Sequence, residues 1–195
     1  RGAAAAAVHG IANQEIAAGP SFAEAWFRFV SWIETLLNNA VKEAEDSEDE
    51  PGEPQIVEEP VLLLAGHNSL RFDFPFLLCE CYRNKISVSC FEHWLFVDTL
   101  QIGQAFPDHG CLKLQCLIRS LSGGEDLRAH QALDDCIALR RVVMAFAWKA
   151  GVSLPNLLSK FAAAVDLDSS IAQISVLLKP SQCNEKARSI TFAQI

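Results

Sequence analysis

The chain has 195 residues, half of them hydrophobic, which is enough for one domain of ordinary size with a sizeable core. Its formal net charge of −8 would ordinarily argue against a nucleic-acid partner, because phosphate binding requires basic groups. The charge is uneven, however, since residues 43–59 contain nine of the 24 acidic residues and no Lys or Arg. The rest of the chain has 15 acidic and 16 basic residues, so the net charge alone does not exclude a nucleic-acid partner.

The apolar runs of the chain are short. The longest, such as PVLLLAG and VVMAFAW, fall well below the about 20 residues of a membrane-spanning helix, so we expect no membrane partner. Seven cysteines are an odd number without a tight framework, which favours reduced thiols in an intracellular compartment over disulfides. The sequence does not distinguish nucleus, cytoplasm and organelle.

The first strong element is an amphipathic helix over residues 20–41. Ser21 and Glu24 form the pattern of a capping box, and apolar residues recur at helical spacing after them. The acidic residues 43–59, which include Pro and Gly, have too little apolar surface to offset the entropy of ordering. We therefore predict a disordered insertion over 43–59.

Strands and helices alternate in the next part of the chain. The run PVLLLAGHN at residues 60–68 is apolar on both faces and predicts a buried strand. Residues 72–84 predict a helix, in which Pro75 occupies a tolerated place in the first turn. Residues 90–100, which are aromatic and apolar, predict a second strand, so the pattern is that of a layered α/β protein.

Helices dominate the remaining sequence. A short amphipathic helix is expected over residues 112–121, and a long helix is expected to begin within residues 128–143. The segment LPNLLSKFAAAV at residues 154–165 predicts one more helix, followed by a tail or the start of a further domain. We assign residues 151–195 to this C-terminal helix and tail.

Three side chains stand where sites form in layered α/β proteins, near the carboxyl ends of strands and the starts of helices. Asp73 follows the first predicted strand, while His130 and Asp135 lie at the start of the long helix. Aspartate oxygens suit hard Mg²⁺ or Mn²⁺ ions, and a pair of such ions stabilises both the attacking and the leaving oxygen in phosphoryl chemistry. A neutral histidine can take the proton from the attacking water.

Two motifs resemble those of the DnaQ-like 3′ to 5′ exonucleases with an Asp-Glu-Asp-Asp-His site. HNSLRFDFPFL at residues 67–77 is similar to their second motif, and HQALDD at residues 130–135 to their third. The segment from Val8 to Ile33 and the strand LFVDTL are also similar to the proofreading subunits of bacterial replicative polymerases. The resemblance implies a ribonuclease H-like fold, a mixed sheet flanked by helices.

The resemblance also implies a role for each site residue. Asp73 and Asp135 would be ligands of two Mg²⁺ or Mn²⁺ ions, and His130 the general base. Asn68 and Phe72 would lie beside the terminal nucleotide. Residues 1–42 would then be the N-terminal part of the exonuclease domain, and residues 60–150 the part with the second and third motifs. The substrate would be a single-stranded DNA or RNA 3′ end, with a second copy of the chain or a polymerase-type protein as partner.

The first motif of that family, an Asp-x-Glu on the first strand, belongs before Val8, and residues 1–8 contain no such pair. We expect either a longer enzyme whose N-terminal strands are missing from this chain, or a protein that kept the fold and lost the metal site. The first expectation is a metal-dependent exonuclease. The alternative is a catalytically inactive interaction module with the exonuclease fold.

Several residues also have simpler interpretations. Asp73 could cap the helix that follows it, and Asp98 and Asp134 are expected to be structural. Cys79, Cys81, Cys90 and His93 could be imagined as a zinc set. Cys79 and Cys81 are two apart on a predicted helix and so face different ways, which favours thiols that behave as small apolar residues.

Overall fold

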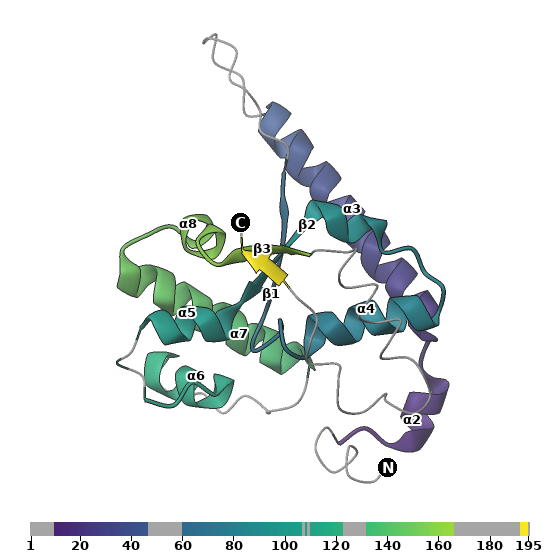
Figure 1. Cartoon of the computed structure of the whole chain (residues 1–195), viewed down its shortest axis with the longest axis horizontal. Helices are drawn as coiled ribbons and strands as arrows, with labels where there is room; N and C mark the ends of the chain where they lie inside the picture. Colours follow the sequence, from purple (N-terminus) through teal and green to yellow (C-terminus); the bar gives the residue numbers. More distant parts are fainter. Residues whose placement is uncertain are drawn as a thin grey trace.

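A small mixed sheet separates two groups of helices (Figure 1). The computed structural model describes residues 10–46, 60–106, 108, 110–122, 132–165 and 192–194. The strands are β1 (Leu62–Gly66), β2 (Trp94–Asp98), β3 (Ala162–Val165) and β4 (Phe192–Gln194), in that order across the sheet. β1 and β2 are parallel, while β3 pairs antiparallel with both β2 and β4. The mixed α/β class predicted from the sequence is confirmed.

Alternation along β2 builds one core on each face of the sheet. Trp94 and Phe96 pack toward α3 (Phe22–Asp46), α4 (Asp73–Arg83) and the 3₁₀ helix η1 (Ser89–His93). Leu95 and Val97 pack toward the other face. β1 follows the same rule, since Leu62 and Leu64 join the first core and Leu63 the second. The sheet is therefore covered on both sides, as expected for strands that are apolar on both faces.

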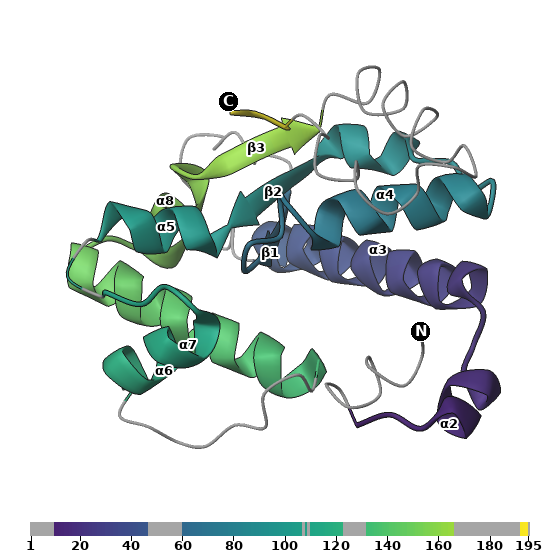
Figure 2. The ribbon, with the colours of Figure 1, turned by 60° about the horizontal axis from the view of Figure 1, so that its bottom comes forward.

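Helices from the second half of the chain form the other core. These are α5 (Thr99–Ala105), α6 (Leu114–Ser122), α7 (Ala132–Ala150) and α8 (Leu154–Ser159). α7 packs mainly on α5, α6 and α8. Figure 2 shows this group on one side of the strands, with α3 and α4 running alongside each other on the other side.

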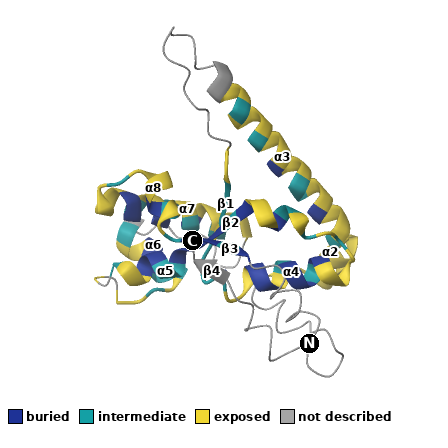
Figure 3. Ribbon diagram, turned by 45° about the horizontal axis from the view of Figure 1, so that its top comes forward, coloured by how far each residue is buried: buried dark blue, intermediate teal, exposed yellow. Residues whose placement is uncertain are grey.

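The long helix α3 begins as the sequence predicts. Glu24 N–H donates to Ser21 Oγ at 3.2 Å, and Ser21 N–H donates to Glu24 Oε2 at 3.4 Å, which completes the capping box. The short helix α2 (Asn13–Ala18) precedes it. In Figure 3 the buried and intermediate positions of α3 recur along one side, and its other described positions are exposed.

Two predicted boundaries differ from the structure. α3 continues to Asp46, so the first four residues of the acidic stretch predicted as disordered are helical, and residues 47–59 lie outside the described part of the chain. The single helix predicted over 154–165 is wrong, because α8 ends at Ser159 and residues 162–165 form β3. Pairing of three of those residues with β2 outweighs the helix preference of the alanines.

The C-terminal segment also departs from the prediction of a helix and tail, because its residues 192–194 form the edge strand β4. Among the described helices, none combines the length and the apolar character needed to cross a membrane.

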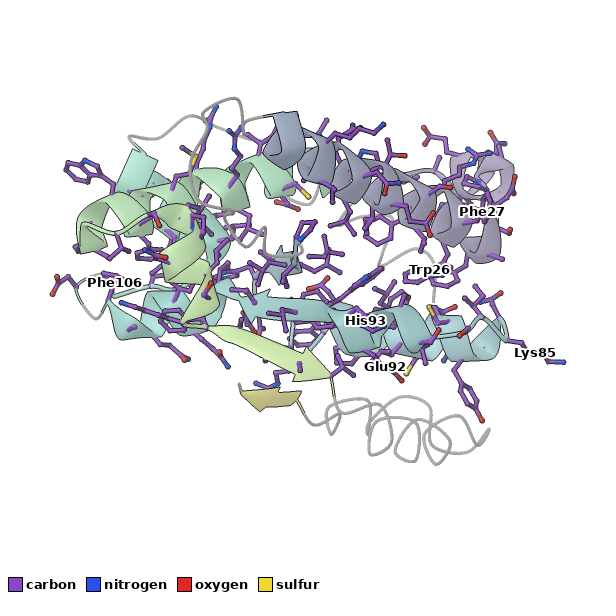
Figure 4. All side chains as sticks on the ribbon, turned by 90° about the horizontal axis from the view of Figure 1, so that it is seen from above. Trp26, Phe27, Lys85, Glu92, His93 and Phe106 are labelled. Atoms are coloured by element: carbon purple, nitrogen blue, oxygen red, sulfur yellow. A yellow bond between two sulfur atoms is a disulfide. The ribbon has the colours of Figure 1, made fainter. Side chains whose placement is uncertain are left out.

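Trp26 is the central contact of α3 with the sheet. Its ring lies 5.5 Å from that of Phe91 and 5.9 Å from that of Trp94, measured between centroids, and the residue is 7% exposed. The neighbouring Phe27 is 72% exposed. In Figure 4, Trp26 lies on the side of α3 that faces α4.

We expect Trp26→Ala to lower the free energy of unfolding by about 3–5 kcal/mol, because it leaves a cavity among four aromatic rings. The matched control Phe27→Ala should change it by less than about 0.5 kcal/mol, since that ring is on the surface. Urea denaturation of both variants measures the difference. Equal losses would show that α3 is not anchored through Trp26.

Candidate functional site

The candidate site lies where the parallel strands β1 and β2 end. Gly66 and Asp98, the last residues of the two strands, are partners in the register, so the segments that leave them start side by side. The chain leaves β1 through residues 67–72 into α4 and leaves β2 directly into α5. In layered α/β proteins this edge is where ligands bind.

Asp98 holds together the two segments that leave β1 and β2. Its Oδ1 accepts hydrogen bonds from Asn68 N–H at 2.7 Å and from Leu100 N–H at 2.9 Å, and its Oδ2 accepts from Leu70 N–H at 3.3 Å. Only 4% of the residue is exposed. A buried carboxylate that accepts three backbone N–H groups is satisfied within the fold, so the structure supports the structural role predicted for Asp98.

The segment that follows β1 makes a sharp turn. Asn68 has φ +58°, in the left-handed region that Asn tolerates better than most residues. A Cβ added to Gly66 would lie 2.4 Å from Ser69 Cβ, so only glycine permits this approach. Ser69 is fully buried, and its hydroxyl donates to Val97 O at 3.4 Å. The turn thereby places Phe72 and Asp73 near the end of the sheet.

His67 also fixes this turn, and the sequence analysis missed it. One ring nitrogen, Nε2, lies 2.9 Å from Leu112 O, and the other, Nδ1, lies 3.0 Å from Thr99 Oγ1. Because a carbonyl oxygen only accepts, Nε2 carries a proton, and in the neutral ring the Thr99 hydroxyl donates to Nδ1. A His directly after a buried strand was the available signal, but its partners are 32 and 45 residues away.

Asp73 is the first residue of α4 and does not cap it. The N-cap position is Phe72, and the helix start has no side-chain capping hydrogen bond. The residue as a whole is exposed, although surrounding atoms partly screen its carboxyl group from water. This partial burial raises the pKa of Asp73 above its ordinary value, the nearby Asp98 carboxylate raises it further, and a backbone hydrogen bond and His67 oppose the shift. The simpler interpretation of Asp73 as a helix cap is therefore wrong.

The other predicted site residues divide into two groups, one near the start of α7 and one in the turn that leads to Asp73. Asp135 is half-buried in the first turn of α7, in the helix group on the opposite face of the sheet. Among the described side chains, Asp98 raises the pKa of Asp73 and His67 lowers it by their charges. His130 lies outside the described residues. Phe72, 51% exposed, and the half-buried Asn68 do lie in the same turn as Asp73.

In the described parts of the chain, no three His, Cys, Asp or Glu side chains are grouped closely enough to hold a metal ion. Asp73 offers the hard oxygen that Mg²⁺ prefers, so the donor type fits, but the number of ligands does not reach that of a closed site. The zinc set of Cys79, Cys81, Cys90 and His93 is likewise not formed.

The cysteines have mixed states. Cys79 and Cys81 are buried and outside the disulfide. Burial, with the neighbouring Cys90 and Glu80, raises the pKa of the Cys81 thiol to about 12. Such a thiol behaves as a small apolar group. Cys111 and Cys116 form a disulfide, contrary to the expectation of reduced thiols throughout. Their Cα atoms are 5.8 Å apart because the chain turns into α6 between them, which sequence spacing alone does not reveal.

Compared with known proteins, the chain matches no family model, and no curated protein gives a significant match. The interpretation of the site therefore rests on its own residues.

We expect Asp98→Asn to lower the free energy of unfolding by about 1–3 kcal/mol, because one acceptor oxygen becomes an amide that cannot accept from a buried backbone N–H. Asp108→Asn is the matched control. Asp108 is exposed and pairs with Lys149 at 3.3 Å, so the loss of its charge should cost less than about 1 kcal/mol. Thermal unfolding of both variants at neutral pH compares them.

We expect Asp73→Asn to make the protein more stable at pH 7. The folded-state pKa is raised above the ordinary value of 3.8, so the ionised carboxylate costs stability at any pH above the folded pKa. This cost disappears as the pH falls through that pKa toward 3.8, and the two proteins should then unfold alike. Calorimetry from pH 7 downward tests the sign. A variant less stable than the wild type at pH 7 would mean that the carboxylate stabilises the helix start.

Proposed function

We propose that the chain contributes the second and third motifs of a metal-dependent 3′ to 5′ exonuclease with a ribonuclease H-like fold. The observation that carries the proposal is the position of Asp73. This exposed residue has a partly screened carboxylate with a raised pKa, and it stands at a helix start without a side-chain cap, beside the joined ends of two parallel strands. A carboxylate held in this way at a cost in stability is typical of functional sites.

The turn after β1 supplies the other contacts of the proposal. Asn68 offers an amide, and Phe72 an exposed ring on which a terminal base can stack, and both lie in the turn that leads to Asp73. The backbone of the turn is fixed by Asp98 and His67, so these side chains are presented from a rigid support. His130 would act as the general base, and Asp135 as the second metal ligand of this chain.

A bound pair of Mg²⁺ or Mn²⁺ ions would stabilise the charge that develops on the phosphate oxygens. Two carboxylates are too few to hold two divalent cations against their mutual repulsion, so the proposal requires the Asp-x-Glu pair as well. β1 pairs only with β2 among the described strands, and its other edge could accept a strand that carries this pair.

An interaction module without catalysis is the second candidate. Four side chains on the surface of α7 favour it, because they form an apolar stripe at helical spacing: Leu133, Ile137, Met144 and Trp148 are all exposed. This candidate predicts neither metal binding nor hydrolysis, with or without an Asp-x-Glu strand.

We expect the 195-residue chain to be inactive on a single-stranded 3′-labelled oligonucleotide, and the chain extended upstream through an Asp-x-Glu strand to release mononucleotides with Mg²⁺. In the extended protein, Asp73→Asn and Asp135→Asn should weaken Mn²⁺ binding measured by calorimetry. His130→Ala should lower turnover by about 10²- to 10⁴-fold and leave metal affinity unchanged.

Asp134→Asn is the matched control, because this neighbour of Asp135 is expected to have no role in metal binding. Undiminished turnover and Mn²⁺ affinity in the Asp73 and Asp135 variants would refute the assignment. An extended protein that neither binds Mn²⁺ nor cleaves the oligonucleotide would favour the interaction module.

A further inference from the structure

Leu112 connects a disulfide ring to the turn after β1. It lies in the ring closed by Cys111 and Cys116, just before α6. Its side chain packs on α5, where a Cβ added to Gly103 would lie 3.2 Å from Leu112 Cδ2. Its backbone oxygen accepts the hydrogen bond from His67 Nε2 at 2.9 Å. The disulfide closes a ring of six residues around this acceptor, which restricts where the oxygen can lie.

His67 carries this restraint to the candidate site. Its ring is held between Leu112 O and the buried Thr99, and its backbone continues into Asn68, whose N–H is bound by Asp98. Asp98 and Thr99 are adjacent, so the imidazole and the following peptide group are fixed to the same two residues at the end of β2. Asp73 begins α4 five residues further along this turn.

We propose that His67 is a positioning residue that couples the Cys111–Cys116 disulfide to the turn carrying Asn68 and Asp73, so that reducing the disulfide displaces these two side chains. The structural part of the proposal is independent of the proposed exonuclease function, and only its effect on turnover rests on that function.

The chemical step is an ordinary thiol–disulfide exchange with a dithiol reductant. A dithiol such as dithiothreitol gives two electrons and two protons to the sulfur atoms of Cys111 and Cys116. The bond between these atoms breaks, two thiols form, and the reagent closes into its own cyclic disulfide. The exposed position of Cys111 leaves the bond accessible to the reagent.

The first test is ¹⁵N NMR of the 195-residue chain before and after addition of dithiothreitol. We expect the backbone amide signals of Asn68 and Asp73 to shift on reduction, together with the Nε2–H signal of His67. The double variant Cys111→Ser, Cys116→Ser should show the reduced positions from the start and no response to the reagent. Cys136→Ser removes an exposed free thiol and should keep the full response.

Two substitutions of His67 distinguish coupling through the hydrogen bond to Leu112 O from a general weakening of the turn. His67→Gln places an amide N–H near the position of Nε2 and can still donate to Leu112 O, so it should retain the response of Asp73 to reduction. His67→Asn is shorter, reaches only toward Thr99 and should abolish that response. Loss of the response in both variants, or its persistence in both, would overturn the role of the Leu112 contact.

In an extended protein with exonuclease activity, reduction should lower kcat by about ten- to a hundredfold and leave KM for the oligonucleotide nearly unchanged, since a displaced group affects the chemical step more than binding. Unchanged NMR signals at Asn68 and Asp73 on reduction would refute the coupling whatever the activity. Shifted signals in a protein without nuclease activity would support the coupling and count against the exonuclease instead.

Discussion

The carboxylate of Asp98 fixes the relative positions of the segments that leave β1 and β2. Without an acceptor at this place, Asn68, Leu70 and Leu100 would each leave a backbone N–H unpaired in a partly buried environment. Because one side chain satisfies all three, the turn after β1 and the start of α5 are held as one unit. The orientation of α4, and with it that of Asp73, depends on this carboxylate.

The two cores give this unit a rigid base. Side chains of β2 alternate between the aromatic cluster under α3 and α4 and the aliphatic cluster under α5 to α8. Phe96 lies on one face and Val97 on the other, both fully buried, so the strand that ends in Asp98 cannot slide or rotate without opening a core. Asp98 is thus held by packing on both sides, while Asp73 lies at the surface beyond it.

Asp73 and Asp98 show how one end of a sheet can hold two carboxylates with different roles. Asp98 is buried and surrounded by backbone donors, which stabilise its charge. Asp73 has no such set of partners in the described part of the chain. Partial burial and the negative charge of Asp98 raise its pKa. A cation near Asp73 would relieve this unfavourable charge, which is the physical link between the observed geometry and the proposed function.

The sequence by itself determined the elements whose signals are local. Helical periodicity identified α3, a short apolar run identified β1, the Ser21 and Glu24 pair identified a helix start, and Pro75 fitted the first turn of α4. The predicted position of Asp73 between a strand and a helix also followed from local pattern. Only the tertiary structure showed that residues 162–165 form a strand, that His67 contacts Thr99 and Leu112, and that Cys111 and Cys116 are joined. These features depend on partners brought together by folding, and neither alanine content nor the spacing of His and Cys residues along the chain reveals which distant groups they meet.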